Sequence, residues 1–329
     1  WYYGPQKRFL SSISFLGFEN RALFEKSEII LAYQKVNESR YQQKVGEDSI
    51  TKRKEFVDVF SLNMNFKKSN FSYGLESIYN FVSSKTNTQQ FGIGSTRYPA
   101  DGSSTFSSAL YLNFLKNLNK RVLFEAGLRN TFSYLQADFS DSIPRSSMGL
   151  EKSTISANWN NLSGSAKITY YPNDSWKIGA VLSKGFHAPN IDDMAKVFVK
   201  GDNITVPNIK LGPEVVYSQE VFVSKESNIG VFYFNGFYTQ IKNAILKDSI
   251  RVNLNASING APELLVSEVI YEGEPYYTFA NQNTKRADIF GFTFGFNSQL
   301  TKKVTLNGDV NFTKGINKNN DLPVPHIPP

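Results

Sequence analysis

The sequence predicts an all-β fold, a transmembrane antiparallel up-and-down β-barrel to which this chain contributes about twelve strands. Three observations support this prediction. Apolar and polar residues alternate with a period of two, the spacing expected of a strand with one apolar face. Aromatic residues make up 14% of the chain, with 27 Phe and 17 Tyr. Short and long connections between the expected strands alternate along the sequence.

The alternation identifies individual strands. It is most regular in the segments 71–81, 121–134, 288–296 and 303–313. In the last of these, one face consists of Val304, Leu306, Val310 and Phe312. Successive side chains of a strand point to opposite faces, so each segment has one apolar and one polar face.

Strand length favours a membrane barrel over a soluble sandwich. Several alternating segments exceed ten residues, whereas strands of soluble proteins are usually about 5–6 residues long. A spanning strand tilted near 45° needs about 9–11 residues. Phe and Tyr on the apolar faces fit the aromatic girdles of such barrels. The mean hydropathy of −0.33 is also compatible, because inward-facing polar residues lower the average.

The connections sort into two classes. Tight links are expected at 67–70, 115–120, 172–175, 225–228 and 300–303. Long polar stretches are expected at 41–54, 84–104, 138–160, 187–213 and 247–276. Short periplasmic turns and long extracellular loops produce this alternation in an up-and-down barrel.

Composition and motifs argue against several function classes. The chain has no Cys, which removes disulfides, thiol nucleophiles and cysteine-based zinc sites. Its net charge of +7 is spread along the sequence, whereas a nucleic-acid-binding protein clusters its positive charge. Nucleophile-elbow, P-loop and dinucleotide motifs are missing, so we expect neither an enzyme nor a bound cofactor.

Several segments carry a family resemblance. "SKGFHAPNIDDMAKVF" (183–198) and "VPNIKLGPEVVYSQEV" (206–221) resemble, in order and spacing, two motifs of TonB-dependent outer-membrane receptors. The matching residues are Gly185, Phe186, Ala188, Pro189, Pro207, Asn208, Pro213 and Glu214. Weaker similarity covers 32–40, 233–245, 281–296 and the proline-rich loop 322–329.

The resemblance implies a fold and a function. Family barrels have 22 strands and a plugged lumen, so residues 1–329 are expected to form part of one barrel domain. The N-terminal plug and the C-terminal closing strands would lie outside this chain. Such receptors lie in the outer membrane of Gram-negative bacteria, in contact with its lipid. They import a scarce solute, here expected to be an iron–siderophore complex, with energy from the inner-membrane TonB complex. The alternatives are a passive channel or porin and a soluble all-β carbohydrate-binding module.

Four polar residues near the first motif are candidate ligand contacts: His187, Asn190, Asp192 and Asp193. Imidazole can coordinate a metal or bind an anion, and His187 stands where the family usually has Arg. The competing interpretation is local. Asn190 would cap a helical turn at 191–198, while the other side chains would form hydrogen bonds within the loop or face water.

A charged row and an aromatic group are further candidates. Arg121, Glu125 and Arg129 have even spacing and are expected to face the lumen, beside a plug or along a solute path. The alternative is that they only line a hydrated barrel interior. Tyr276, Tyr277 and Phe279 could stack on a flat ligand, but we favour a place in the outer girdle of the next strand.

Overall fold

The computed structural model describes most of the chain. The described residues are 2–18, 21–43, 46, 50–88, 92–93, 96, 98–100, 102–139, 148, 150, 154–271, 273–284, 286–318 and 321–324. The loop 322–329 singled out in the sequence therefore falls largely outside the described residues. Within the described part, no helix has the length and apolar character needed to span a membrane.

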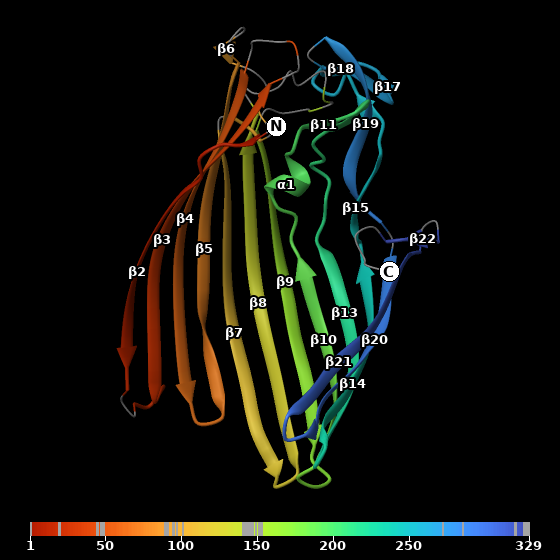
Figure 1. Cartoon of the computed structure of the whole chain (residues 1–329). Coiled ribbons are helices and arrows are strands. Elements are labelled where there is room, and N and C mark those ends of the chain that lie inside the picture. The colour runs from red at the N-terminus through yellow and green to blue at the C-terminus, as the bar shows by residue number, and fades with distance from the viewer. Residues whose placement is uncertain are drawn as a thin grey trace.

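One curved antiparallel sheet forms the wall (Figure 1). Among the described residues it has 15 strands, and removing the two-residue pieces β1 (Tyr2–Tyr3), β6 (Gly92–Ile93) and β22 (Leu322–Pro323) leaves twelve, as the sequence predicted. The long strands are β2 (Lys7–Gly17), β3 (Lys26–Gln43), β4 (Ile50–Lys68), β5 (Phe71–Thr88), β7 (Ser103–Asn119), β8 (Val122–Asp138), β9 (Thr154–Tyr170), β10 (Trp176–His187), β13 (Glu214–Ser227), β14 (Gly230–Lys242), β20 (Arg286–Thr301) and β21 (Val304–Asn317).

The connections confirm the predicted alternation. All five expected tight links join neighbouring wall strands at one end of the sheet, where β4 ends at Lys68 and β5 begins at Phe71, for example. The long connections gather at the opposite end (Figure 1). The first four lie within the predicted ranges and are shorter where the strands run further than predicted. The last extends past its predicted range at both ends, because β14 ends at Lys242 and β20 begins only at Arg286.

The apolar face of the wall is exposed, as expected of a lipid-facing surface. Leu110 is 64% exposed and Val310 61%, and on β20 and β21 the rings of Phe292 and Phe312 pack side by side with centroids 5.7 Å apart. A soluble sandwich would bury this face under a second sheet. The apolar residues instead form a continuous outward surface suited to hydrocarbon.

Aromatic side chains concentrate near both ends of this surface. Toward the long connections, five residues directly opposite one another on consecutive strands form the outer aromatic row: Tyr33, Phe60, Tyr79, Phe106 and Tyr134. Near the tight turns, Phe71 packs against Phe114 with ring centroids 5.0 Å apart. These two aromatic bands correspond to the girdles that sequence analysis predicted.

Smaller elements occupy the end with the long connections. They are helix α1 (Ile191–Met194), a second sheet of β11 (Phe198–Lys200), β12 (Asn203–Thr205), β15 (Ile245–Ser249), β18 (Glu268–Tyr271) and β19 (Glu274–Asn283), and the pair β16 (Val252–Asn253) and β17 (Leu265–Val266). We refer to them together as the extracellular assembly. Strand β19 pairs with β12, β15 and β18 and with no wall strand among the described residues.

This pairing corrects one expectation. Tyr276, Tyr277 and Phe279 belong to β19 of the second sheet and not to the girdle of β20. The chain leaves the second sheet after Asn283, whose side-chain amide donates to the backbone oxygens of Gly212 and Asn243. The segment 281–296, which carries part of the weaker family similarity, is therefore divided between two sheets.

Candidate functional site

The inner face of the wall changes character toward its extracellular end. On β8, Leu135 and Ala137 lie on the same face as the lumen residue Arg129, yet both are buried. They pack into one apolar cluster with α1 and β12, represented by Met194 and Ile204, which are 1% and 0% exposed. The extracellular assembly is therefore folded inward and anchored on the upper lumen wall. It is the principal hydrophobic core among the described residues.

His187 lies where the wall meets this assembly. Outward residues at this level include Lys184 and Gln240, so the imidazole is beyond the apolar band. Its Nδ1 is 3.1 Å from Oε2 of Glu214 on β13, and its Nε2 is 3.5 Å from Oδ2 of Asp193 on α1. The hydrogen bond with Glu214 raises the pKa of His187, whereas burial raises the pKa of Asp193.

The short helix α1 is held by the residues that sequence analysis named. Asn190 accepts a hydrogen bond from the backbone N–H of Asp193, whose carboxylate accepts from the backbone N–H of Asn190. This reciprocal pair is a capping box. The cap at Asn190 is thus confirmed, although the helix ends at Met194, earlier than expected. Asp192 accepts from the hydroxyl of Tyr98 at 2.6 Å and from Lys196 at 2.9 Å.

The second family motif fastens the same region from the other side. Pro207 is buried, and the side chain of Asn208 donates to the backbone oxygen of Asn281 on β19 at 2.7 Å. The second carboxylate oxygen of Glu214 accepts from the backbone N–H of Ile245. Pro213 precedes Glu214 at the start of β13.

The first motif has a similar role. Gly185 and Phe186 belong to the last residue pairs between β10 and β13, with Phe186 opposite Val215 of β13. Ala188 and the buried Pro189 then lead into the cap of α1. Motif residues from both segments thus join β10, α1, β13 and β15. Their observed contacts are structural, and ligand binding by His187, Asn190, Asp192 and Asp193 stays a prediction.

A group of cations and rings on the second sheet was not predicted from the sequence. Lys196 Nζ lies 5.4 Å from the ring centroid of Phe198, and Lys247 Nζ lies 5.4 Å from that of Phe279. Burial and the nearby charges of Lys196 and Lys200 lower the pKa of Lys247. We call Lys196, Lys200, Lys247, Phe198 and Phe279 the lysine–aromatic face. Lys196, Phe198 and Lys200 come from one short segment, whereas Lys247 and Phe279 are distant in the sequence and are brought to it by strand pairing.

The lumen below is polar and crossed by ion pairs. Arg129 of β8 reaches over β7 and donates two hydrogen bonds to Glu76 of β5, at 3.1 and 3.3 Å. Tyr111 of β7 lies between them and packs across Gly74, where a Cβ atom would collide with its hydroxyl. Glu76, Tyr111, Arg129 and Asn113 line a groove on the lumen side with a volume of about 510 Å³.

Two of the three predicted lumen charges lie on the inner wall. Glu125 pairs with Lys167 on the neighbouring strand β9 at 2.7 Å, and Arg129 makes the contact with Glu76 described above. Arg121 instead lies in the turn before β8, where its backbone N–H donates to the side chain of Asn119. The β-ladder starts only at Val122, so the regular alternation cannot be extended back to Arg121.

In the part of the chain that the structure describes, no group of three or more His, Asp or Glu side chains is placed to hold a metal ion.

The chain matches the family model "TonB dependent receptor-like, beta-barrel" over residues 8–329. It therefore belongs to the TonB-dependent receptors, whose barrels lie in the outer membrane of Gram-negative bacteria. The family assignment, the barrel fold and the location expected from the sequence are thereby confirmed.

Solved structures agree on the fold. The copper transporter OprC superimposes with a TM-score of 0.72 at 14% identity, covering 99% of this chain and 49% of that one. The ferric yersiniabactin uptake receptor FyuA from Yersinia pestis gives 0.62 at 15% identity, with 98% and 46% covered. The siderophore receptor PirA from Acinetobacter baumannii gives 0.56 at 13% identity, with 94% and 44% covered. The chain thus spans about half of each of these proteins. No curated protein matches the sequence.

Proposed function

We propose that this chain is part of a receptor that imports a scarce, bulky solute across the outer membrane by energy-coupled transport, and that the solute is an iron–siderophore complex. The observation that carries the proposal is the packed extracellular assembly, anchored by Leu135 and Ala137 inside the mouth of a polar lumen. A passive pore needs only an open mouth. A receptor for a dilute solute needs a shaped surface, which an assembly with its own core provides.

The lysine–aromatic face supports an anionic chelate as the solute. Ferric complexes with carboxylate or catecholate groups carry negative charge, and catecholates add flat rings. Lys200 and Lys247 are exposed and repel one another, so a bound anion would relieve the repulsion. Phe279 offers a ring for stacking beside the lysines. Binding of this kind requires no covalent chemistry.

Transport itself is proposed to depend on parts outside this chain. A plug domain in the lumen would block passage until the inner-membrane TonB complex pulls on it. The ion pairs Arg129–Glu76 and Glu125–Lys167 present both charge signs to the lumen. Such a surface can contact a plug through polar groups that exchange readily with water, as a movable domain requires.

Growth experiments test the proposal. A strain lacking the full-length gene would be grown on single iron sources: a panel of ferric siderophores, haem and ferric citrate. A second arm would limit copper, given the fold shared with the copper transporter OprC. Loss of growth on one ferric siderophore, restored by the gene, is the expected result. Normal growth on every iron source would contradict the iron proposal. Uptake that persists without TonB would indicate a passive channel.

Charge reversal then tests the binding surface. The double variant Lys200→Glu/Lys247→Glu should reduce binding of the identified chelate at least tenfold. Lys210→Glu is the matched control, since Lys210 is exposed on the connection between β12 and β13 and outside the lysine–aromatic face. Equal effects of the variant and the control would show that the face is not the binding surface.

A further inference from the structure

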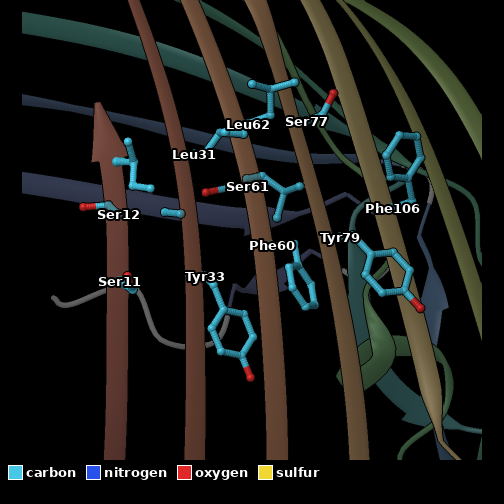
Figure 2. A pocket seen from close by; sticks show the side chains of 13 residues that line it. Ser11, Ser12, Leu31, Tyr33, Phe60, Ser61, Leu62, Ser77, Tyr79 and Phe106 are labelled. Carbon is cyan, nitrogen blue, oxygen red and sulfur yellow. The ribbon is translucent and has the colours of Figure 1, made fainter. Parts of the chain in front are cut away.

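The outward side of β2–β5 carries an apolar groove in the wall. Its border on the extracellular side is the outer aromatic row, where Tyr33 and Phe60 pack with ring centroids 4.8 Å apart. Figure 2 shows the rings of Tyr33, Phe60 and Tyr79 projecting side by side from three neighbouring strands. Ile13 and Leu31 line the groove on the side of the rings that is nearer the tight turns. The volume of the groove is about 460 Å³.

Small residues create the hollow. Ser77 of β5 lies in the row below the aromatic residues, opposite Leu62 of β4 and Ser108 of β7. The hydroxyls of Ser77 and Ser108 are 2.8 Å apart and share one hydrogen bond. A leucine or phenylalanine here would fill the space. The groove thus faces hydrocarbon as a dry slot between aromatic rings and aliphatic side chains.

Lysines cluster on the same outward face, nearer the extracellular end. We call the five exposed residues that share it the outward lysine cluster: Lys7, Lys35, Lys52, Lys54 and Lys85. On the described parts of β2–β5 above the aromatic row, the acidic residue on this face is Asp58, which lies 3.9 Å from Lys35 and accepts from Tyr33. The surface is therefore strongly positive.

The register makes two of these lysines direct neighbours. Lys54 of β4 is paired with Lys85 of β5, and Lys52 lies one row above on the same face. Like charges directly opposite each other destabilise an antiparallel pair. Among the described residues neither Lys54 nor Lys85 has a carboxylate partner. The wall thus holds two ammonium groups without a carboxylate partner side by side on its outward face, on the extracellular side of the outer aromatic row.

We propose that this face is a specific binding site for a phosphate-bearing lipid of the outer leaflet. One acyl chain would occupy the groove at Ser77, and the head-group phosphates would lie among the outward lysine cluster. Charge complementarity identifies the lipid, because an uncharged lipid would leave the repulsion between Lys54 and Lys85 in place. The site is separate from the proposed solute path, since it lies on the opposite face of the wall.

Lipid binding by the full-length receptor would test this. The protein would be purified in detergent, stripped of lipid and titrated with lipopolysaccharide and, in parallel, with its enzymatically dephosphorylated form. The double variant Lys54→Gln/Lys85→Gln should bind lipopolysaccharide about 30-fold more weakly than wild type, equivalent to about 2 kcal/mol for two lysines at an anionic surface. Dephosphorylation should weaken binding by the wild type more than binding by the variant, which keeps three lysines of the cluster.

Two further variants separate the parts of the site. Lys116→Gln/Lys120→Gln removes the same charge near the tight turns, at the far end of the wall, and should bind like wild type. Ser77→Phe fills the groove without touching a lysine and should also weaken binding. In lipid-free detergent, Lys85→Gln should melt at a higher temperature than wild type, because the repulsion with Lys54 is relieved. In saturating lipopolysaccharide, Lys85→Gln should melt at a lower temperature than wild type.

Three outcomes would overturn the proposal. The first is unchanged lipopolysaccharide affinity in Lys54→Gln/Lys85→Gln. The second is an equal loss in the control at Lys116 and Lys120, which would indicate only overall charge. The third is equal binding of phosphorylated and dephosphorylated lipid by the wild type. Defective solute uptake would affect none of these measurements, so this proposal and the proposed function fail independently.

Discussion

His187 of β10 faces Glu214 of β13 across the extracellular end of the sheet, with imidazole Nδ1 3.1 Å from the carboxylate Oε2. Asp193 of α1 approaches the other ring nitrogen. The same Glu214 carboxylate accepts the backbone N–H of Ile245. His187 therefore joins the wall to α1, and its partner Glu214 joins the wall to β15.

This arrangement predicts a pH-dependent attachment of α1. Glu214 raises the pKa of His187 above its ordinary value of 6.5. The charged contact is therefore fully present below pH 6.5 and is lost as the pH rises through the raised value. Proteolysis of the segment 188–213 in the full-length protein should accelerate once the pH exceeds the raised pKa of His187. The variant His187→Arg should show a flat profile there, and the same pH dependence in this variant would rule out His187 as the cause.

The opposite facing of neighbouring residues on β20 predicts unequal costs for charge insertion. Phe292 faces outward and stacks on Phe234 with centroids 6.2 Å apart, whereas Thr293 donates to Asn311 on the lumen side. Phe292→Arg should destabilise the barrel by about 2–4 kcal/mol if it lies near the bilayer midplane. Thr293→Arg should cost much less. Urea unfolding of the full-length barrel in lipid vesicles measures both, and equal costs would contradict the assigned facing.

The direction of the sheet across the membrane predicts which ends are accessible. Asn255 lies in the extracellular assembly after β16, and Asn228 lies in the tight turn between β13 and β14. An epitope tag near Asn255 should be labelled on intact cells. A tag near Asn228 should be labelled only after the outer membrane is opened. Labelling in the reverse order would show that the topology is inverted.

The wall could be predicted from the sequence because its signal is local. Every second residue on strands such as β21 faces lipid, so the pattern Val304, Leu306, Val310 and Phe312 is visible without knowing the partners. The capping of α1 by Asn190 was likewise local. Both predictions depend only on residues a few positions apart.

The extracellular assembly could not be predicted in this way. Apart from β19, its strands are short: β12 has three residues and β16 two, too few to show a period. Its central contact is the parallel pairing of β12 with β19, about seventy residues later in the chain. The lysine–aromatic face and the ion pair Arg129–Glu76 depend on the same kind of long-range register. Sequence analysis therefore identified individual residues of the site but not which of them meet.

The core of the extracellular assembly predicts that it can open while the wall stays intact. Ile204 of β12 is 0% exposed and packs among residues of α1 and the inner wall, whereas Ile209 on the next connection is 36% exposed. Ile204→Ala should cost about 2–5 kcal/mol of local stability, because it removes buried methyl groups and leaves a cavity. Ile209→Ala should cost far less.

Hydrogen exchange on the full-length protein distinguishes local opening from unfolding of the barrel. In Ile204→Ala, amides of β12 and β19 should exchange faster, while amides of β13 and β14 keep their protection, because the wall ladder does not rest on this core. If the variant loosens β13 and β14 to the same degree, the assembly and the wall form one cooperative unit. In that case solute binding at the lysine–aromatic face would be coupled directly to barrel stability, and not confined to a separately folded mouth.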